Sequence, residues 1–478
     1  MTIGKSAGTA WVILALVQSG SVLAQGANHS GGNGGDAIRC SSGKDDIAIV
    51  ACGHIIEDRR ENADNRAIAL RNRAFHYQQV GDLDHAIADY TTGLQRPEPH
   101  PLQAKTHLNR GLMYALKGDE VRALLDYSEA VTLDSTLASA YINRATIYIK
   151  RSNYELALGD LDRAAALKPL DGEILASRGS IYAHRGEQDR AIADFTKAIE
   201  FDPNNAVAWR GRSFAYRAIG ENDKAAGDAE QALRLNPNLA GAHLDLGLSH
   251  QGSGNAALAI AEFDKAIKQN PRDAQAVKAR GDAYLAKGDS ERAIADFGRA
   301  IELEPTMTSA YLNRGVALLG NSAWDAAITD FTSALALDPS QYAAFLNRGQ
   351  AFQAKHEGDR AIADFTRAIA VNPGAMDAYR HRAFSLQESG DGAGAIADYT
   401  RVLDANPKDS EALRGRGFAH VHHHEIDAAI ADLTAAIALN PGDALAYHFR
   451  ALAYERKKET RRADADEAVA LRLEPKSH

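Results

Sequence analysis

One alanine recurs at a fixed step of 34 residues through most of this chain, and that spacing limits the possible folds more than any other feature. Proline keeps the same period from Pro169 to Pro475. A strict period of about 20 to 50 residues is typical of a repeat array, in which each small unit packs only on its neighbours. A length of 478 residues alone would suggest several globular domains. The repeat instead predicts one elongated array. The recurring alanines are Ala123, Ala157, Ala191, Ala225, Ala259, Ala293, Ala327, Ala361, Ala395, Ala429 and Ala463.

Each unit is predicted to be a pair of antiparallel helices, as residues 138–171 illustrate. Ala145 and Tyr148 in the first half share one helical face, and Ala157 begins the same spacing in the second half. Pro169 then ends the second helix, because proline lacks the amide donor that a helix interior needs. The pattern predicts an all-α protein of the solenoid class.

The first 24 residues are typical of a secretory signal peptide. Lys5 gives a positive start, Ala10 to Val17 form an apolar run, and a small-residue cleavage site precedes Gln25. The apolar run is shorter than the roughly 20 residues that span a bilayer, although an uncleaved anchor is the alternative. We expect residues 1–24 to be removed and the mature protein to be periplasmic or secreted, without a stable membrane span.

Residues 25–44 are rich in Gly, Ser and Asn, and such a segment cannot bury enough apolar surface to fold. We expect a flexible segment there, followed by an N-terminal capping helix within 45–66. The two cysteines of the chain, Cys40 and Cys52, lie at this junction. In an oxidising compartment an even pair favours a disulfide, whereas two free thiols or an incomplete metal site are the alternatives.

The repeat resembles the tetratricopeptide repeat, and the resemblance implies a right-handed superhelical α-solenoid of about twelve helix-turn-helix units. In that family the first helices line a concave groove, which binds peptides. The motif residues of one unit are Tyr311, Arg314, Gly315, Leu318, Ala327, Phe331, Ala334 and Pro339. The expected repeats span 67–103, 104–137, 138–171, 172–205, 206–239, 240–273, 274–307, 308–341, 342–375, 376–409, 410–443 and 444–478.

The leucine that the family places before a small first-helix residue is arginine in eleven of twelve units, and an acid follows the recurring alanine by three residues. The exception has Leu246 and Glu262. We expect a ladder of ion pairs, one per repeat, that fixes helix register more than it stabilises the fold; a solvated surface is the alternative. We expect Asp330→Ala to cost more stability than Arg314→Met. Representative pairs are Arg144 with Asp160, Arg314 with Asp330, and Arg348 with Asp364.

The groove positions carried over from the family differ from repeat to repeat. Arginine next to aromatic residues is the composition of binding hot spots. We therefore expect a peptide with apolar anchors and acidic groups; the alternative is that the phenylalanines pack internally and the arginines are solvated. The partner-binding candidates are Arg210, Phe214, Arg217, Leu312, Val316, Leu346, Arg380, Phe384, Arg414 and Phe418.

The family also contains a two-carboxylate clamp with Lys and Asn at set groove positions. Here Lys278 stands at the first position, but Asp282 stands where the clamp needs asparagine. Because an acid repels a carboxylate, we expect no ligand of that kind.

Four histidines lie close together in the sequence. Neutral imidazoles could bind zinc, copper or nickel, which makes His422, His423 and His424 a weak metal candidate. However, His420 stands at a site that is usually a core tyrosine, and the others lie at a turn. We expect an ordinary turn there.

Composition and motifs together favour a protein without catalytic activity or cofactor. The zinc-protease, phosphate-loop and nucleophile-elbow motifs are absent from the sequence, and the repeats leave no room for a catalytic domain. The net charge of −9, with both signs interspersed, argues against a nucleic-acid partner. We predict a protein–protein interaction scaffold with protein or peptide partners. The alternatives are a metal-binding or sensing protein built on the His420–His424 cluster, and a structural spacer or self-assembling rod.

The repeats around Leu246 should form the softest part of the array. Gly227 and Ala229 thin the packing of one repeat, and the next has a glycine-rich turn ending at Gly254. We expect amide hydrogen exchange to be faster in these two repeats than around Phe331, because poorly packed helices open at lower free energy. Equal exchange rates in the two regions would contradict this prediction.

Overall fold

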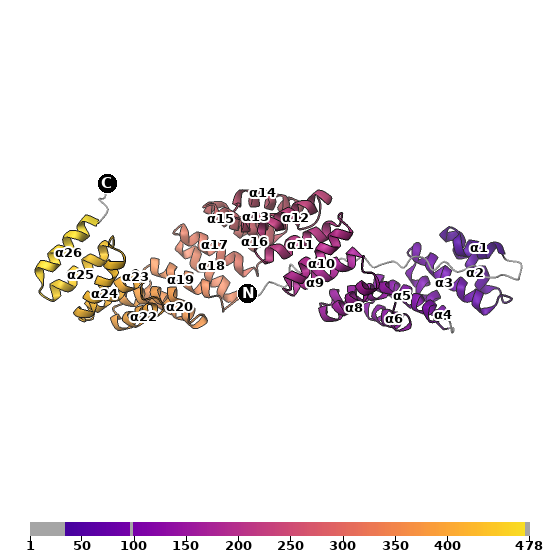
Figure 1. Cartoon of the computed structure of the whole chain (residues 1–478), viewed down its shortest axis with the longest axis horizontal. Coiled ribbons are helices and arrows are strands. Elements are labelled where there is room, and N and C mark those ends of the chain that lie inside the picture. Colours follow the sequence, from indigo (N-terminus) through magenta and orange to yellow (C-terminus); the bar gives the residue numbers. More distant parts are fainter. Residues whose placement is uncertain (1–33, 96–98, 474–478) are drawn as a thin grey trace. The chain divides into compact units, whose positions relative to one another are not determined.

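The computed structural model describes residues 34–95 and 99–473, and these residues form 26 α-helices and no strand (Figure 1). The predicted signal peptide lies outside the described residues. The chain divides into two compact units, one ending at Gly254 and the other beginning at Asn255. The all-α solenoid predicted from the sequence is confirmed within each unit.

The first unit contains thirteen helices and the second contains thirteen more. The helices of the first unit are α1 (Gly34–Ser42), α2 (Asp45–Glu57), α3 (Ala63–Gln79), α4 (Leu83–Leu94), α5 (His100–Leu116), α6 (Glu120–Leu133), α7 (Ala138–Lys150), α8 (Tyr154–Leu167), α9 (Gly172–His184), α10 (Gln188–Phe201), α11 (Ala206–Ala218), α12 (Asn222–Leu235) and α13 (Ala242–Gly252). Those of the second unit are α14 (Ala256–Gln269), α15 (Ala274–Ala286), α16 (Ser290–Leu303), α17 (Thr308–Gly320), α18 (Trp324–Leu337), α19 (Tyr342–Ala354), α20 (Gly358–Val371), α21 (Met376–Glu388), α22 (Gly392–Ala405), α23 (Ser410–His422), α24 (Ile426–Leu439), α25 (Ala444–Arg456) and α26 (Thr460–Leu473).

Most first helices begin at the residue where the 34-residue period places the start of a repeat, as α7, α9 and α11 do. Three begin elsewhere. Helix α3 begins four residues early because Asn62 caps it by accepting a hydrogen bond from the Asn65 amide, and α5 begins after Pro99. Helix α13 begins two residues late because Gly241 adopts a left-handed conformation with φ of 77°.

Where the second helix carries an aromatic ring, the small residue on the first helix of that repeat makes room for it. A Cβ added to Gly315 would lie 2.7 Å from Phe331, and one added to Gly349 would lie 2.6 Å from Phe365. Both rings are completely buried. Packing therefore requires glycine at positions 315 and 349, where a larger residue would wedge the two helices apart.

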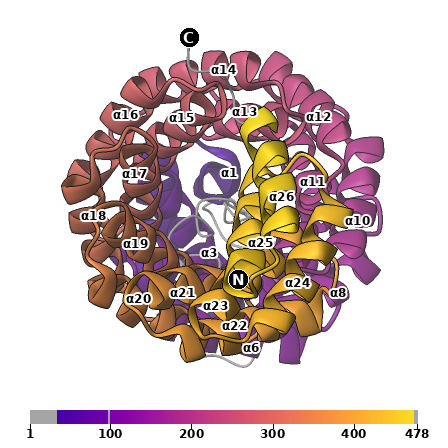
Figure 2. The same ribbon diagram turned by 90° about the vertical axis from the view of Figure 1, so that its left-hand side faces the viewer.

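The first helices lie on the concave side of each unit. First helices of adjacent repeats contact one another, for example α9 with α11 and α17 with α19, whereas second helices show no comparable contacts among the described residues. Figure 2 shows α17, α19 and α21 on the inner side of the curved second unit, with α16, α18 and α20 outside. Side chains on the inner surface of the first helices thus form the groove.

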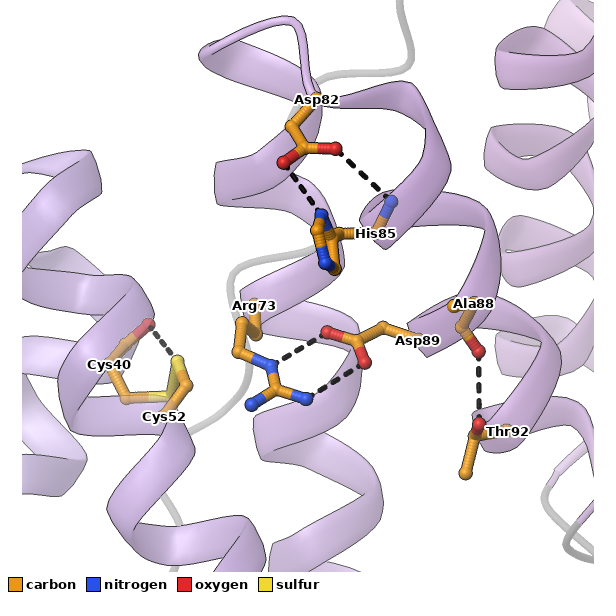
Figure 3. A network of polar contacts seen from close by, with 8 residues as sticks. All are labelled: Cys40, Cys52, Arg73, Asp82, His85, Ala88, Asp89 and Thr92. Atoms are coloured by element: carbon orange, nitrogen blue, oxygen red, sulfur yellow. Dashed lines mark hydrogen bonds and ion pairs between the residues drawn. A yellow bond between two sulfur atoms is a disulfide. The ribbon is translucent and has the colours of Figure 1, made fainter.

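A disulfide joins the first two helices, as the cysteine pair predicts. Cys40 of α1 and Cys52 of α2 are 2% and 0% exposed (Figure 3). Ala37 packs beside them, so the bridge and this small apolar cluster hold α1 against α2. The expectation of a flexible segment over 25–44 is therefore wrong for residues 34–42. Composition alone does not show that a disulfide holds these residues against α2. Residues 25–33 lie outside the described part.

Arginine and aspartate form an ion pair between the two helices of a repeat in eleven repeats, five in the first unit and six in the second. In each pair Nε donates to Oδ2 and Nη2 donates to Oδ1 over 2.7 to 2.9 Å, the forked geometry that matches guanidinium to carboxylate. The ladder is thus present. The pairs are Arg73–Asp89 (Figure 3), Arg110–Asp126, Arg144–Asp160, Arg178–Asp194, Arg212–Asp228, Arg280–Asp296, Arg314–Asp330, Arg348–Asp364, Arg382–Asp398, Arg416–Asp432 and Arg450–Asp466.

The third nitrogen of the guanidinium reaches the preceding repeat, which the sequence did not suggest. Nη1 of Arg348 donates to the Thr332 hydroxyl over 3.0 Å, and Nη1 of Arg178 donates to the Asp162 carboxylate over 2.8 Å. Each such arginine therefore ties together three helices. The acceptors in the preceding second helices are Thr91, Ser128, Asp162, Thr196, Asp264, Thr332, Thr366, Thr400 and Thr434.

The ladder is interrupted where Leu246 replaces arginine. Glu262, which stands at the acid position of that repeat, pairs with the neighbouring Lys265 over 2.7 Å. The division of the chain at Gly254 falls within the same repeat. The softness predicted for this region stays a prediction.

Burial opposes the charge of the ladder carboxylates, and the hydrogen bonds that they accept offset this effect to different degrees. Burial raises the pKa of Asp160, and the hydrogen bond from Arg144 offsets this effect only in part. At Asp126 burial also acts to raise the pKa, but hydrogen bonds from Arg110 and His107 outweigh it and lower the pKa overall. The outcome thus differs between the two acids, whereas the hydrogen bonds to these acids raise the pKa of the partner arginines, Arg144 and Arg110.

The burial of Asp330 reverses the order of mutational cost expected from the sequence. Asp330 is 3% exposed, whereas the Arg314 side chain is 26% exposed and can turn toward water. We expect Arg314→Met to destabilise the fold by about 3 kcal/mol, because it leaves a buried carboxylate unpaired, and Asp330→Ala to cost about 1–2 kcal/mol. Urea unfolding followed by circular dichroism measures both. Lys224→Met, at the exposed pair with Glu221, is the control with a small effect, and an equally small effect for Arg314→Met would contradict the ladder's role.

Candidate functional site

Of the predicted groove residues, Arg210 belongs to the interior of the fold. Its Nε donates to Oδ2 of Asp245 over 2.7 Å, and Nη2 of Arg217 lies 3.8 Å from the other oxygen of the same carboxylate. The Arg217 guanidinium also lies over the Phe214 ring, 5.2 Å from its centre. These contacts link α11 to α13. The expectation that Arg210 faces a ligand is therefore corrected, because the partner, Asp245, stands outside the repeat motif.

Burial opposes both charges of this link. It raises the pKa of the Asp245 carboxyl and lowers the pKa of Arg210, and attraction between the two groups compensates only in part. Asp245 directly precedes Leu246, the residue at which the ladder lacks its arginine. The Arg210–Asp245 pair thus supplies a polar tie between adjacent repeats where the ladder has none.

The apolar middle of the groove is partly used by the core. Leu312 packs against the cluster of Ala334, Leu335 and Ala344, and Leu346 packs against the Phe365 cluster. Val316 of α17 is 37% exposed and remains available on the groove face. Of the three predicted residues in this stretch, Val316 is thus the one with its side chain most open to a partner.

Arg380 and Arg414 are both paired with aspartates that cap the following first helix. Nη2 of Arg380 donates to Asp409 over 2.8 Å and its Nη1 to Glu411 over 3.3 Å, while Nη1 of Arg414 donates to Asp443 over 2.8 Å. The other oxygen of each aspartate accepts a backbone hydrogen bond at the start of α23 or α25. The sequence reasoning missed these carboxylates, although an aspartate 29 residues after each arginine was the available signal.

The two phenylalanines beside these arginines differ in exposure. Phe384 of α21 is 43% exposed on the groove face. Phe418 of α23 instead contacts Phe449 of α25, with ring centres 4.2 Å apart, and His422 meets its edge at 4.4 Å. Phe384 therefore offers an open ring, whereas Phe418 belongs to an aromatic cluster along the next two first helices.

The histidines do not converge on a metal site. His420 pairs with Glu425 over 2.5 Å, His423 contacts the same carboxylate at 3.1 Å, and His424 occupies the left-handed turn position with φ of 63°. No group of three or more potential metal ligands occurs among the described residues. The arrangement is that of an interhelical turn held by Glu425.

The clamp position of α15 is closed by an internal ion pair. Nζ of Lys278 lies 2.7 Å from Asp282, which also accepts a hydrogen bond from the Asn313 amide over 2.7 Å. The departure from the clamp noted in the sequence thus has a structural counterpart. Helices that combine the length and apolar character needed to cross a bilayer do not occur in the described part of the chain.

Repeated helical hairpins whose first helices line a concave face define the class of tetratricopeptide repeat proteins. A model of the tetratricopeptide repeat matches residues 72–138, 142–206, 212–274, 244–307, 278–342, 346–409 and 382–423. The chain belongs to the tetratricopeptide repeat family. No curated protein matches it.

Solved structures of repeat proteins are similar over long stretches but at low identity. The Cut9–Hcn1 hetero-tetramer of the APC/C matches at 16% identity over 88% of this chain and 89% of that one, with a TM-score of 0.41. A repeat protein from Parabacteroides merdae matches at 21% over 53% and 98%, with a TM-score of 0.42. YrrB, described as having an unusual peptide-binding site, matches at 24% over 38% and 95%, with a TM-score of 0.34.

The buried link at Asp245 should contribute strongly to stability. Asp245→Asn leaves Arg210, whose side chain is 12% exposed, without its counter-charge, so we expect a loss of about 3 kcal/mol. Asp282→Asn, at a half-buried pair with Lys278, should cost less than about 1 kcal/mol. Urea unfolding of the two variants compares them directly. Equal losses would show that Asp245 does not lock α11 to α13.

Proposed function

We propose that this protein is an exported, non-catalytic scaffold that holds segments of partner proteins along the concave face of its repeats. Membership of the tetratricopeptide repeat family supports a role in protein interaction. The observation that carries the finer proposal is the exposure of Val316 and Phe384, 37% and 43%, on first helices of the second unit. Exposed apolar side chains on a concave face are typical of binding surfaces.

The arrangement of charge favours a protein partner over a nucleic acid. The arginines of the ladder and of the groove are engaged with carboxylates of the chain itself, as at Arg348 and Arg414. A nucleic-acid surface needs cations that are free to neutralise phosphates. The paired arginines therefore support the proposal of a protein ligand.

Export is supported by the cysteine chemistry. The Cys40–Cys52 disulfide, which joins α1 to α2, is buried, and structural disulfides persist in oxidising compartments such as the periplasm or the cell exterior. The proposed signal peptide, residues 1–24, fits the same destination.

Site-specific photo-crosslinking in cells tests the scaffold proposal. A photoreactive amino acid placed at Val316, on a first helix, should give covalent adducts with partner proteins, because this side chain faces the groove. The same amino acid at Leu258, 53% exposed on the second helix α14, serves as the matched control and should give none. Equal labelling from both positions, or none from either, would contradict a groove-binding scaffold.

A further inference from the structure

Two residues of the first unit depart from the repeat pattern by exposing a large apolar side chain. Leu170, in the loop between α8 and α9, is 72% exposed, although the corresponding loops carry a polar residue or glycine at this position. Phe201 ends α10 and is 42% exposed, whereas the second helices of the other repeats end at Leu, Gln, Val or Ala within the described part of the chain. The residues that correspond to Leu170 are Thr136, Asn204, Asn238, Arg272, Thr306, Ser340, Gly374, Lys408 and Gly442.

Both departures line one open hollow, which we call the α9–α10 hollow. Its volume is about 510 Å³, and its apolar walls are formed by Leu170, Phe201 and Pro169. A Cβ added to Gly172 would lie 3.0 Å from the backbone oxygen of Ala198, so glycine lets the start of α9 lie against the last turn of α10. The volume falls within the roughly 300–1,000 Å³ that is typical of ligand-binding sites.

The polar residues of the hollow carry an excess of negative charge. Asp171, Glu173 and Asp202 line it, and the one cation among the lining residues is Lys168, whose Nζ lies 3.9 Å from Asp171. Glu173 and Asp202 are exposed, and no ion pair engages either of them within the described residues. Carboxylates around an apolar surface complement a basic partner, because opposite charges across an interface attract and acidic partners are repelled.

We infer that the α9–α10 hollow is a second protein-binding surface, which takes an aromatic or large aliphatic side chain flanked by lysine or arginine. The apolar side chain would cover Leu170 and Phe201, which the repeat itself has no need to expose. A flanking arginine would meet Glu173 or Asp202, and its guanidinium could also lie over the Phe201 ring. This surface lies on a loop and on the end of a second helix, so the inference goes beyond the proposed binding in the concave groove.

A phage-displayed library of random twelve-residue peptides tests the inference. The library is first depleted on the Leu170→Asn variant, which carries the residue found at Asn204 in the next loop, and is then panned on the purified full chain. Enriched peptides should place an aromatic or large aliphatic residue next to lysine or arginine. Binding of their synthetic forms should fall at least about tenfold with Leu170→Asn and be retained with Leu170→Met.

The contribution of charge is measured on the same peptides. The double variant Glu173→Gln with Asp202→Asn should weaken binding at least about threefold and flatten its dependence on salt between about 50 and 300 mM. Asparagine at position 202 keeps the loop intact, because Asn236 accepts the same backbone hydrogen bond in the next loop as Asp202 does from the Asn204 amide. Unchanged binding and salt dependence would overturn the basic partner.

Two control variants separate the hollow from other apolar surfaces. Leu337→Asn, at an equally exposed residue that ends α18, and Val316→Ser, in the groove, should both leave binding unchanged. Enrichment no greater than on bare support, or an equal loss with Leu337→Asn, overturns the inference. Binding that depends on Val316 and not on Leu170 also overturns it but supports the groove scaffold. Unchanged urea midpoints for each variant establish that a loss of binding is not a loss of fold.

Discussion

A single guanidinium, bonded to three helices at once, is the constraint on which the geometry of the repeats depends. In Arg348 two nitrogens fork onto Asp364 of the same repeat and the third reaches Thr332 of the preceding one. Lysine could not reproduce this, because its ammonium is a point charge without a planar fork. Burial acts against the charge of the ladder acids, as at Asp160, so part of the attraction within each pair offsets desolvation. Glycine and aromatic residues, such as Gly315 with Phe331, then fill the space that the bonds define.

Internal pairing of charged side chains also determines the composition of the groove surface. The chain uses its groove-side arginines to hold neighbouring first helices, Arg210 through Asp245 and Arg414 through Asp443. What remains for a partner is apolar surface at Val316 and Phe384. Binding to a surface of this composition depends more on shape and apolar contact than on charge, so its affinity should depend little on salt.

The sequence predicted the fold in detail because the period, the prolines and the small residues all constrain the same local geometry. Helix starts such as that of α17 at Thr308 follow from the 34-residue step alone. The ladder was predictable because both partners recur. The pairing of the groove arginines was not predictable in this way. Arg210 and Arg380 bond to carboxylates of a neighbouring repeat, and such carboxylates occur in only one or two repeats. Composition likewise missed α1, which depends on the Cys40 bridge.

Nine of the eleven ladder arginines reach toward the preceding repeat, and this common direction gives the array a polarity. In each of these arginines Nη1 donates to a side chain of the preceding repeat, as Nη1 of Arg382 does to the Thr366 hydroxyl. The ladder contacts of a repeat are therefore complete as soon as the preceding repeat is in place, whereas groove-side pairs such as Arg210–Asp245 form only with the following repeat. Synthesis also proceeds from the N-terminus. Each new hairpin can therefore form its ladder contacts on a repeat that has already been made, and the direction of the arginine side chains matches the order of assembly.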